Sequence, residues 1–69
     1  MKQYEVIVES ATRKIDLIVE NVETTVGNLL HGTAIGYRTK EGDLKKYNTP
    51  LDFKTSCRFT MLEFDGVLE

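Results

Sequence analysis

Two stretches near the start of the chain decide the fold: QYEVIVE at residues 3–9 and KIDLIVE at residues 14–20. Apolar and polar side chains alternate along both, which is the period of a β-strand with one buried face. The intervening residues 10–13 are enough for a hairpin connection. The two stretches therefore predict an antiparallel hairpin that buries one of its faces.

Two isoleucines depart from this alternation, because Ile7 and Ile18 fall on faces that are otherwise polar. Two hairpin registers remain open. One sets the isoleucines directly opposite each other, whereas the other places Glu9 opposite Lys14, gains a charge pair and separates them. In either register an apolar patch stays on the outer face, and we expect a helix, a second sheet layer or another subunit to cover it.

The next segment is ambiguous between helix and strand. Its apolar residues have helical spacing, Asn21 suits an N-cap and Gly32 suits the position after the last turn. Its β-branched residues and Gly27 oppose a helix. We predict a short helix at about 21–31; the alternative is a second strand that continues to about Glu23 and is followed by a loop. The helical stripe consists of Val22, Val26, Leu29 and Leu30.

The second half of the chain again indicates strands. Residues 33–39 alternate, and residues 44–47 would pair back with them across a turn. Gly42 can take the left-handed position of a three-residue hairpin loop. Pro50 then breaks the pattern, because proline cannot donate to a strand ladder. A second hairpin is therefore expected here.

The last strand is predicted at residues 56–64 and is the longest. It is partly apolar on both faces, which favours a central place in the fold or a subunit interface. The chain as a whole is predicted to be one mainly β (small α+β) domain over residues 1–69. It would contain two antiparallel hairpins and a fifth C-terminal strand that form a curved sheet or small barrel.

The short length raises the question of what stabilises the domain. A chain of 69 residues has a thin core, and such domains usually add disulfides, a structural metal or a partner subunit. Cys57 is the single cysteine, and with His31 it supplies two of the roughly four ligands of a structural zinc site. We therefore expect no disulfide, metal or cofactor, and we expect a homo-oligomer.

Catalysis is not expected from this sequence. Cys57 and His31 are the only candidates for a nucleophile and its base. Cys57 lies in a strand pattern, where a free cysteine usually acts as a small apolar residue. His31 would lie at the C-terminus of the predicted helix, where it suits a capping role or is simply exposed to solvent. We therefore predict no catalytic residues and no enzymatic activity.

The expected compartment is the cytoplasm, without a membrane partner. No stretch approaches the roughly 20 apolar residues of a membrane span. The first residues lack the apolar run of a signal peptide. A lone cysteine is typical of reducing compartments.

Charge is distributed unevenly along the chain, although the formal net charge is only −2. Residues 36–60 hold six Lys or Arg and three Asp or Glu residues, a net charge of +3, while residues 61–69 hold three acidic and no basic residues, a net charge of −3. Mixed basic and aromatic residues suit single-stranded nucleic acid, although such domains usually have a pI above about 9. This alternative function would use Tyr37, Arg38, Lys40, Lys45, Lys46, Tyr47 and Lys54.

The leading hypothesis is a small binding module that acts by protein–protein contact as a regulator, inhibitor or adaptor of a larger, unidentified protein. Its thin core, its misplaced isoleucines and its doubly apolar last strand all favour a contact surface. The short length, acidic composition and lack of catalytic motifs alone suggest a phage or mobile-element origin. A third alternative is capture of a small ligand between subunits. The expected interface consists of Ile7, Ile18, Leu62 and Phe64.

Overall fold

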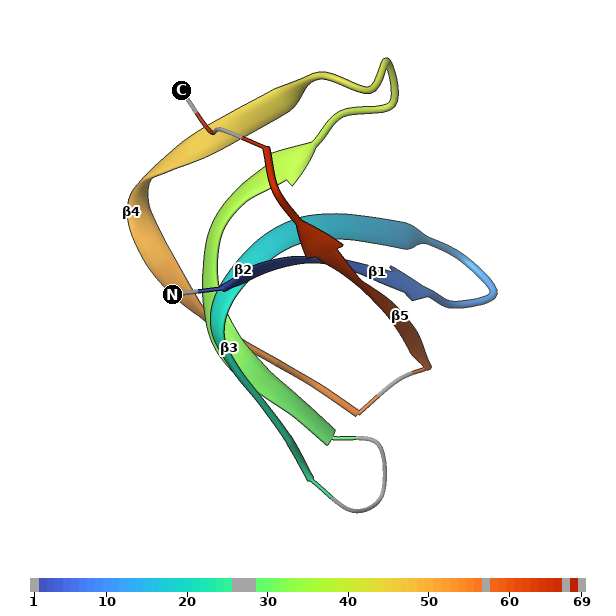
Figure 1. Ribbon diagram of the computed structural model, residues 1–69. Helices are drawn as coiled ribbons and strands as arrows, with labels where there is room; N and C mark the ends of the chain where they lie inside the picture. The colour runs from blue at the N-terminus through green and yellow to red at the C-terminus, as the bar shows by residue number, and fades with distance from the viewer. Residues whose placement is uncertain (1, 26–28, 57, 67, 69) are drawn as a thin grey trace.

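The computed structural model describes residues 2–25, 29–56, 58–66 and 68. Five antiparallel strands form one sheet in the order β4-β3-β2-β1-β5 (Figure 1). This confirms the predicted mainly β fold with two hairpins and a fifth strand, and the sheet is curved but not closed. The strands are β1 Gln3–Glu9, β2 Lys14–Thr25, β3 Leu29–Arg38, β4 Leu44–Thr55 and β5 Phe59–Phe64.

The first hairpin adopts the register with Glu9 opposite Lys14. Val6 therefore lies opposite Leu17, while Glu5 lies opposite Ile18. Directly opposed residues share a face of the sheet, so this register keeps the alternating apolar side chains of both strands, apart from Ile7 and Ile18, on one face. The two isoleucines are separated, because Ile7 lies opposite Asp16.

The predicted helix at about 21–31 is wrong for the described residues. Residues 21–25 continue β2 and residues 29–31 begin β3; Val26 and Gly27 lie outside the described residues. A strand forms here because the alternation of side chains along a strand places Leu30 in the core, where its exposure is 0%. Strand β2 extends past the predicted end at about Glu23, so the alternative with a longer second strand was closer to the structure.

A β-bulge lies where the helix was expected to begin. The register between β2 and β3 shifts between Glu20 and Glu23, so two residues of β2 oppose the single residue Gly32. Asn21 has a left-handed φ of 55°, a conformation that asparagine tolerates better than most residues. The bulge increases the local twist, and it allows the long strand β2 to bend (Figure 1).

Both turns follow the sequence prediction. In the first, the Ser10 amide donates to the carbonyl oxygen of Arg13 at 2.9 Å. In the second, the Thr39 amide donates to the carbonyl oxygen of Asp43 at 2.8 Å, and Gly42 has a φ of 93°. Glycine adopts this left-handed conformation without the cost of a Cβ clash, as expected for the last position of a three-residue loop.

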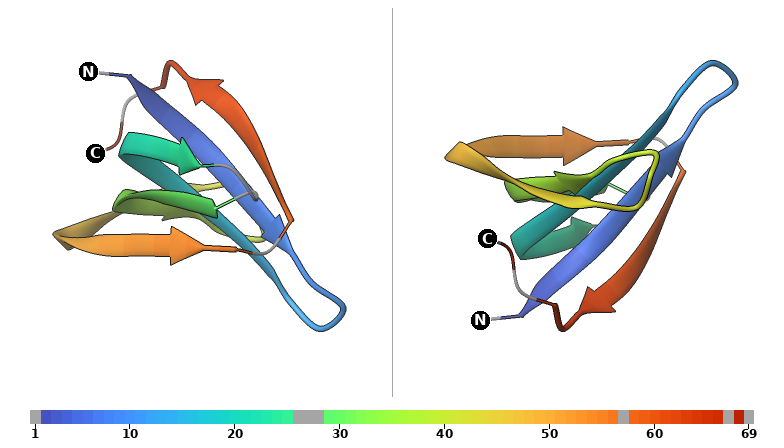
Figure 2. Two further views of the ribbon diagram at one scale, coloured as in Figure 1. Left: turned by 90° about the horizontal axis from the view of Figure 1, so that it is seen from below. Right: turned by 90° about the horizontal axis from the view of Figure 1, so that it is seen from above.

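The core lies on the concave face of the sheet. Phe53 of β4 and Phe59 of β5, the two edge strands, pack against a cluster contributed by the three inner strands. The sheet must therefore curve around that cluster, and Figure 2 shows its strands from two further sides. We call this the concave face and the opposite one the convex face. The buried cluster consists of Val6, Val8, Leu17, Val19, Leu30 and Ala34.

Strand β5 differs from its prediction in length and place. It spans Phe59–Phe64 and is the shortest of the five strands, whereas residues 56–64 had been expected to form the longest; Cys57 lies outside the described residues. It lies at an edge of the sheet, paired only with β1. A central place therefore does not account for its apolar residues. No helix in the described part of the chain is long and apolar enough to cross a membrane.

Candidate functional site

The four predicted interface residues lie on the convex face. Leu62 pairs with Glu5 and Phe64 with Gln3, so both β5 side chains share the face that carries Ile7 and Ile18. Their exposure differs: Leu62 is 53% exposed, Ile18 is 0% exposed, and Ile7 and Phe64 are half-buried. The structure thus brings the predicted residues to one face, but among these four it leaves only Leu62 largely exposed.

Ile18 is covered by its own chain. Its partner on β3 is Gly36, and the side chain of Leu68 lies so close to Gly36 that a Cβ placed there would meet a Leu68 methyl group at 3.0 Å. Leu68 therefore packs over this part of the convex face. Sequence reasoning expected a helix, a second sheet layer or another subunit as the cover. Ile18 consequently has no exposed surface with which a partner could make contact.

The two edge strands carry different side chains. Strand β4 holds Lys45, Lys46, Pro50 and Lys54, and lysine and proline are common means of preventing an exposed edge from pairing. Strand β5 reads FTMLEF and has neither residue type. Among the described residues, no strand pairs with the far side of β5. The edge at β4 is thus protected by lysines and proline, and we call it guarded; the edge at β5 has Glu63 as its single charged residue, and we call it unguarded.

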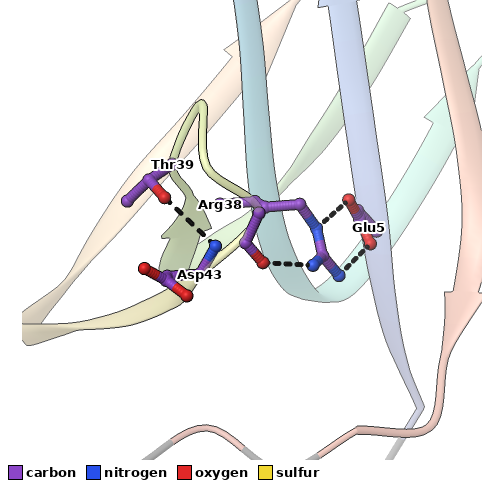
Figure 3. Close-up of polar contacts among 5 residues, drawn as sticks. Glu5, Arg38, Thr39 and Asp43 are labelled. Carbon is purple, nitrogen blue, oxygen red and sulfur yellow. Dashed lines mark hydrogen bonds and ion pairs between the residues drawn. The ribbon is translucent and has the colours of Figure 1, made fainter.

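A bidentate ion pair crosses the convex face from β1 to β3 (Figure 3). The Nε and Nη2 atoms of Arg38 donate to the Glu5 carboxylate at 2.8 and 3.0 Å, and Nη1 donates to the carbonyl oxygen of Gly42 at 2.8 Å. The Glu5 side chain is 14% exposed and that of Arg38 is 32% exposed. The bridge fixes the 39–43 turn against the first hairpin, and no sequence pattern joined these two residues.

Asp16 lies beside this bridge in an unfavourable environment for a charge. Burial, followed by the neighbouring Glu5 carboxylate, raises the pKa of Asp16 to about 6. Its Oδ1 atom is buried without a hydrogen-bond partner among the described residues. The hydrogen bond from Arg38 lowers the pKa of Glu5 in turn. Of the two neighbouring carboxylates, Glu5 therefore stays ionised to lower pH, and Asp16 is protonated more readily.

The residues predicted for nucleic acid are divided between two faces. Tyr37 lies opposite Leu17 and so belongs to the concave face, where its ring centroid is 5.3 Å from that of Tyr47. Lys46 pairs with Gly36 and therefore lies on the convex face. By the same reasoning, Lys45 lies on the concave face, and Arg38 and Lys54 lie on the convex face. Lys40 lies in the turn that follows β3.

His31 lies in β3 and not at a helix end. Its Nε2 atom is 2.7 Å from Oδ1 of Asp52 on β4, and both side chains are largely exposed. The predicted capping role is therefore wrong, whereas the alternative of solvent exposure agrees with the structure, where His31 contacts Asp52 at the surface of neighbouring strands. Cys57 lies outside the described residues, so the structure does not place the cysteine–histidine pair. Within the described ranges, no group of three or more His, Cys, Asp or Glu side chains could hold a metal ion.

The functional classification receives no help from known proteins. No protein-family model, no curated protein and no solved structure matches this chain. Function is therefore inferred from the surfaces of the molecule, beginning with the unguarded edge strand β5.

Proposed function

We propose that this chain is a non-enzymatic binding module that acts by protein–protein contact, with the free edge of β5 as its contact site and a second copy of the chain as its first partner. The observation that carries the proposal is the unguarded edge. Extended segments commonly bind by adding a strand to such an edge, because the backbone hydrogen bonds supply affinity. Larger complexes with other proteins would be built on this dimer.

The side chains of β5 support an interface. Met61 lies opposite Val6 on the concave face and is 38% exposed, while Leu62 on the convex face is 53% exposed. An edge strand with accessible apolar groups on both faces can bury them when a neighbouring strand is added. Such pairing would explain why β5 is apolar on both faces although it lies at an edge of the sheet.

The exposed area points the same way. The chain exposes 5126 Å² of surface at a mass of 7.9 kDa. A compact monomer of that mass typically exposes about 4400 Å². The excess is what an open sheet leaves uncovered, and association is a common way for a domain this small to bury more apolar surface.

The proposed partner is a second copy in an isologous arrangement. Two β5 strands can pair about a two-fold axis, and two-fold dimers are the commonest oligomers. Met61 and Leu62 are the middle residues of β5, so pairing centred on the strand places them near that axis. The two copies of Glu63 would lie on opposite sides of the axis, and each is 3.7 Å from Lys2 of its own chain. The guarded strand β4 would stay at the outer edges of the joined sheet.

The replacement Leu62→Lys tests this arrangement. It puts a lysine near its own symmetry copy and removes an apolar contact, so we expect a dimer to become a monomer. The fold should persist because Leu62 is largely exposed. Light scattering coupled to size-exclusion chromatography, from micromolar to millimolar protein, should give twice the chain mass of 7.9 kDa for the unmodified protein and a single chain mass for the variant.

The matched control is Leu51→Lys on the other edge strand. Leu51 is 51% exposed, close to the 53% of Leu62, but it belongs to β4. This variant should remain a dimer. An unmodified protein that is monomeric throughout the concentration range would refute the proposal, and dissociation by both variants would replace it with a head-to-tail contact between β5 and β4.

The nucleic-acid alternative has weaker support. Its seven residues are divided between the two faces and a turn, so they do not form one platform along which a strand could lie. Arg38 has its guanidinium engaged with Glu5 and Gly42. Tyr47 packs against the core, and its ring lies beside that of Tyr37. An aromatic residue committed in this way offers less area for stacking with a base.

A further inference from the structure

A cleft lies between the two hairpin turns, away from the β5 edge. Its volume is about 620 Å³, within the usual range of small-molecule sites. The first turn and the start of β2 form one wall, and the end of β3 and the second turn form the other. The lining residues are Thr12, Arg13, Lys14, Asp16, Arg38, Thr39, Lys40 and Gly42.

Cations from both walls gather in this cleft. Arg38 is already bonded to Glu5 and to the carbonyl oxygen of Gly42. Arg13, Lys14 and Lys40 take part in none of the ion pairs found among the described residues. Lys14 also lies opposite Glu9 and near Asp16. The cationic side chains that line the cleft still outnumber its one lining carboxylate, and such an excess of positive charge attracts an anion. The arrangement therefore leaves three cationic side chains available for a ligand.

The remaining lining groups indicate what kind of anion fits. Thr12 and Thr39 contribute hydroxyl groups, and the lining contains no aromatic side chain on which a base could stack. Asp16 is the one acidic side chain in the lining, and the cationic side chains there outnumber it. Several separate donors around a compact volume suit an anion with many acceptor oxygens and more than one charge. A carboxylate or a single phosphodiester would satisfy fewer of them.

We propose that this cleft binds the terminal phosphate group of a small, multiply charged phosphate compound. The site is independent of the proposed dimer, because none of its lining residues belongs to β5. Arg13, Lys14 and Lys40 bind the phosphate oxygens, and the two threonine hydroxyls donate to them. The bridge between Arg38 and Glu5 keeps the second turn in position.

The proposal is tested by titrating the folded protein with inorganic pyrophosphate and following the heat of binding. Arg13→Gln and Lys40→Gln should each weaken binding by roughly tenfold, because each removes a hydrogen bond to a charged group. Lys45→Gln and Lys54→Gln remove the same charge from outside the cleft and should have little effect. Far-ultraviolet circular dichroism verifies that all four variants keep the sheet.

Two further ligands distinguish the source of the phosphate. A nucleoside triphosphate that binds as tightly as pyrophosphate indicates that the phosphate end alone is recognised, and tighter binding indicates a nucleotide. An oligonucleotide with a 5′-hydroxyl should bind more weakly than either. Absence of pyrophosphate binding overturns the proposal. So does an equal effect of cleft and control variants, or binding of the oligonucleotide alone.

Discussion

The replacement Gly36→Ala should lower the free energy of unfolding by about 2–3 kcal/mol, as overpacking of a close contact does. A Cβ at this position would lie 2.5 Å from the carbonyl oxygen of Lys45, which is backbone and cannot swing aside. It would also meet a methyl group of Leu68 at 3.0 Å. Relief requires β3 and β4 to separate beside the Gly36–Lys46 pair, so the loss should appear in urea denaturation followed by circular dichroism.

A second glycine provides the control for this experiment. Gly42 has a φ of 93° and an added Cβ would meet nothing within 4 Å, so Gly42→Ala introduces backbone strain without a clash. Its cost should be about 1–2 kcal/mol, the usual penalty of the left-handed conformation. Equal stability of Gly36→Ala and the unmodified protein would show that β4 does not approach β3 as closely as described.

The replacement Asp16→Asn should stabilise the protein at neutral pH by about 1–2 kcal/mol. A pKa raised from 3.8 to about 6 means that the folded state disfavours the charged carboxylate. One pKa unit corresponds to about 1.4 kcal/mol, and partial exposure of the side chain reduces the full value. Asparagine keeps the shape, removes the charge and can still donate a hydrogen bond towards Glu5.

The stabilisation expected from Asp16→Asn should depend on pH. Between pH 3.8 and about 6 the folded protein binds more protons at Asp16 than the unfolded chain does, so the contribution of Asp16 to stability falls as pH rises through this window. The gain from Asp16→Asn should therefore be present at pH 7.5 and nearly vanish at pH 4. Glu5 acts in the opposite direction, because its pKa is lowered and its contribution is lost as pH falls.

Denaturation curves at the two pH values measure this difference directly. The variant and the unmodified protein share Glu5, so its contribution largely cancels in the comparison. Glu9→Gln, an exposed carboxylate change at the end of β1, should alter stability little at either pH. A destabilising effect of Asp16→Asn at pH 7.5 would mean that Asp16 forms a favourable contact as an anion.

The sequence predicted the fold correctly where the same physical requirement sets both the local residue pattern and the structure. Alternation in residues 3–9 and 14–20 predicted the first hairpin, because burial of one face imposes that period. Gly42 marked the second turn because few other residues accept its backbone conformation. The helix prediction failed because Leu30 satisfies both helical and strand spacing, and only the neighbouring strand shows which spacing is used.

The candidate sites depend on contacts that local pattern does not contain. Glu5 and Arg38 are 33 positions apart, and strand order alone brings them to either side of β2. The cleft likewise joins two turns from different hairpins, so neither Arg13 nor Lys14 stood out along the chain. Leu62 and Phe64 were selected because a strand that is apolar on both faces is unusual, whereas the packing of Leu68 beside Gly36 had no sequence signal.

Amide hydrogen exchange of the unmodified chain, compared at low and high protein concentration, tests the role of β5 most directly. Pairing of two β5 strands would protect amides that face solvent in the single chain, because exchange reports the opening of individual hydrogen bonds. We expect exchange in β5 to slow as concentration rises, while exchange in β4 stays constant. Exchange in β5 that does not change with concentration, or that slows together with β4, would contradict this account.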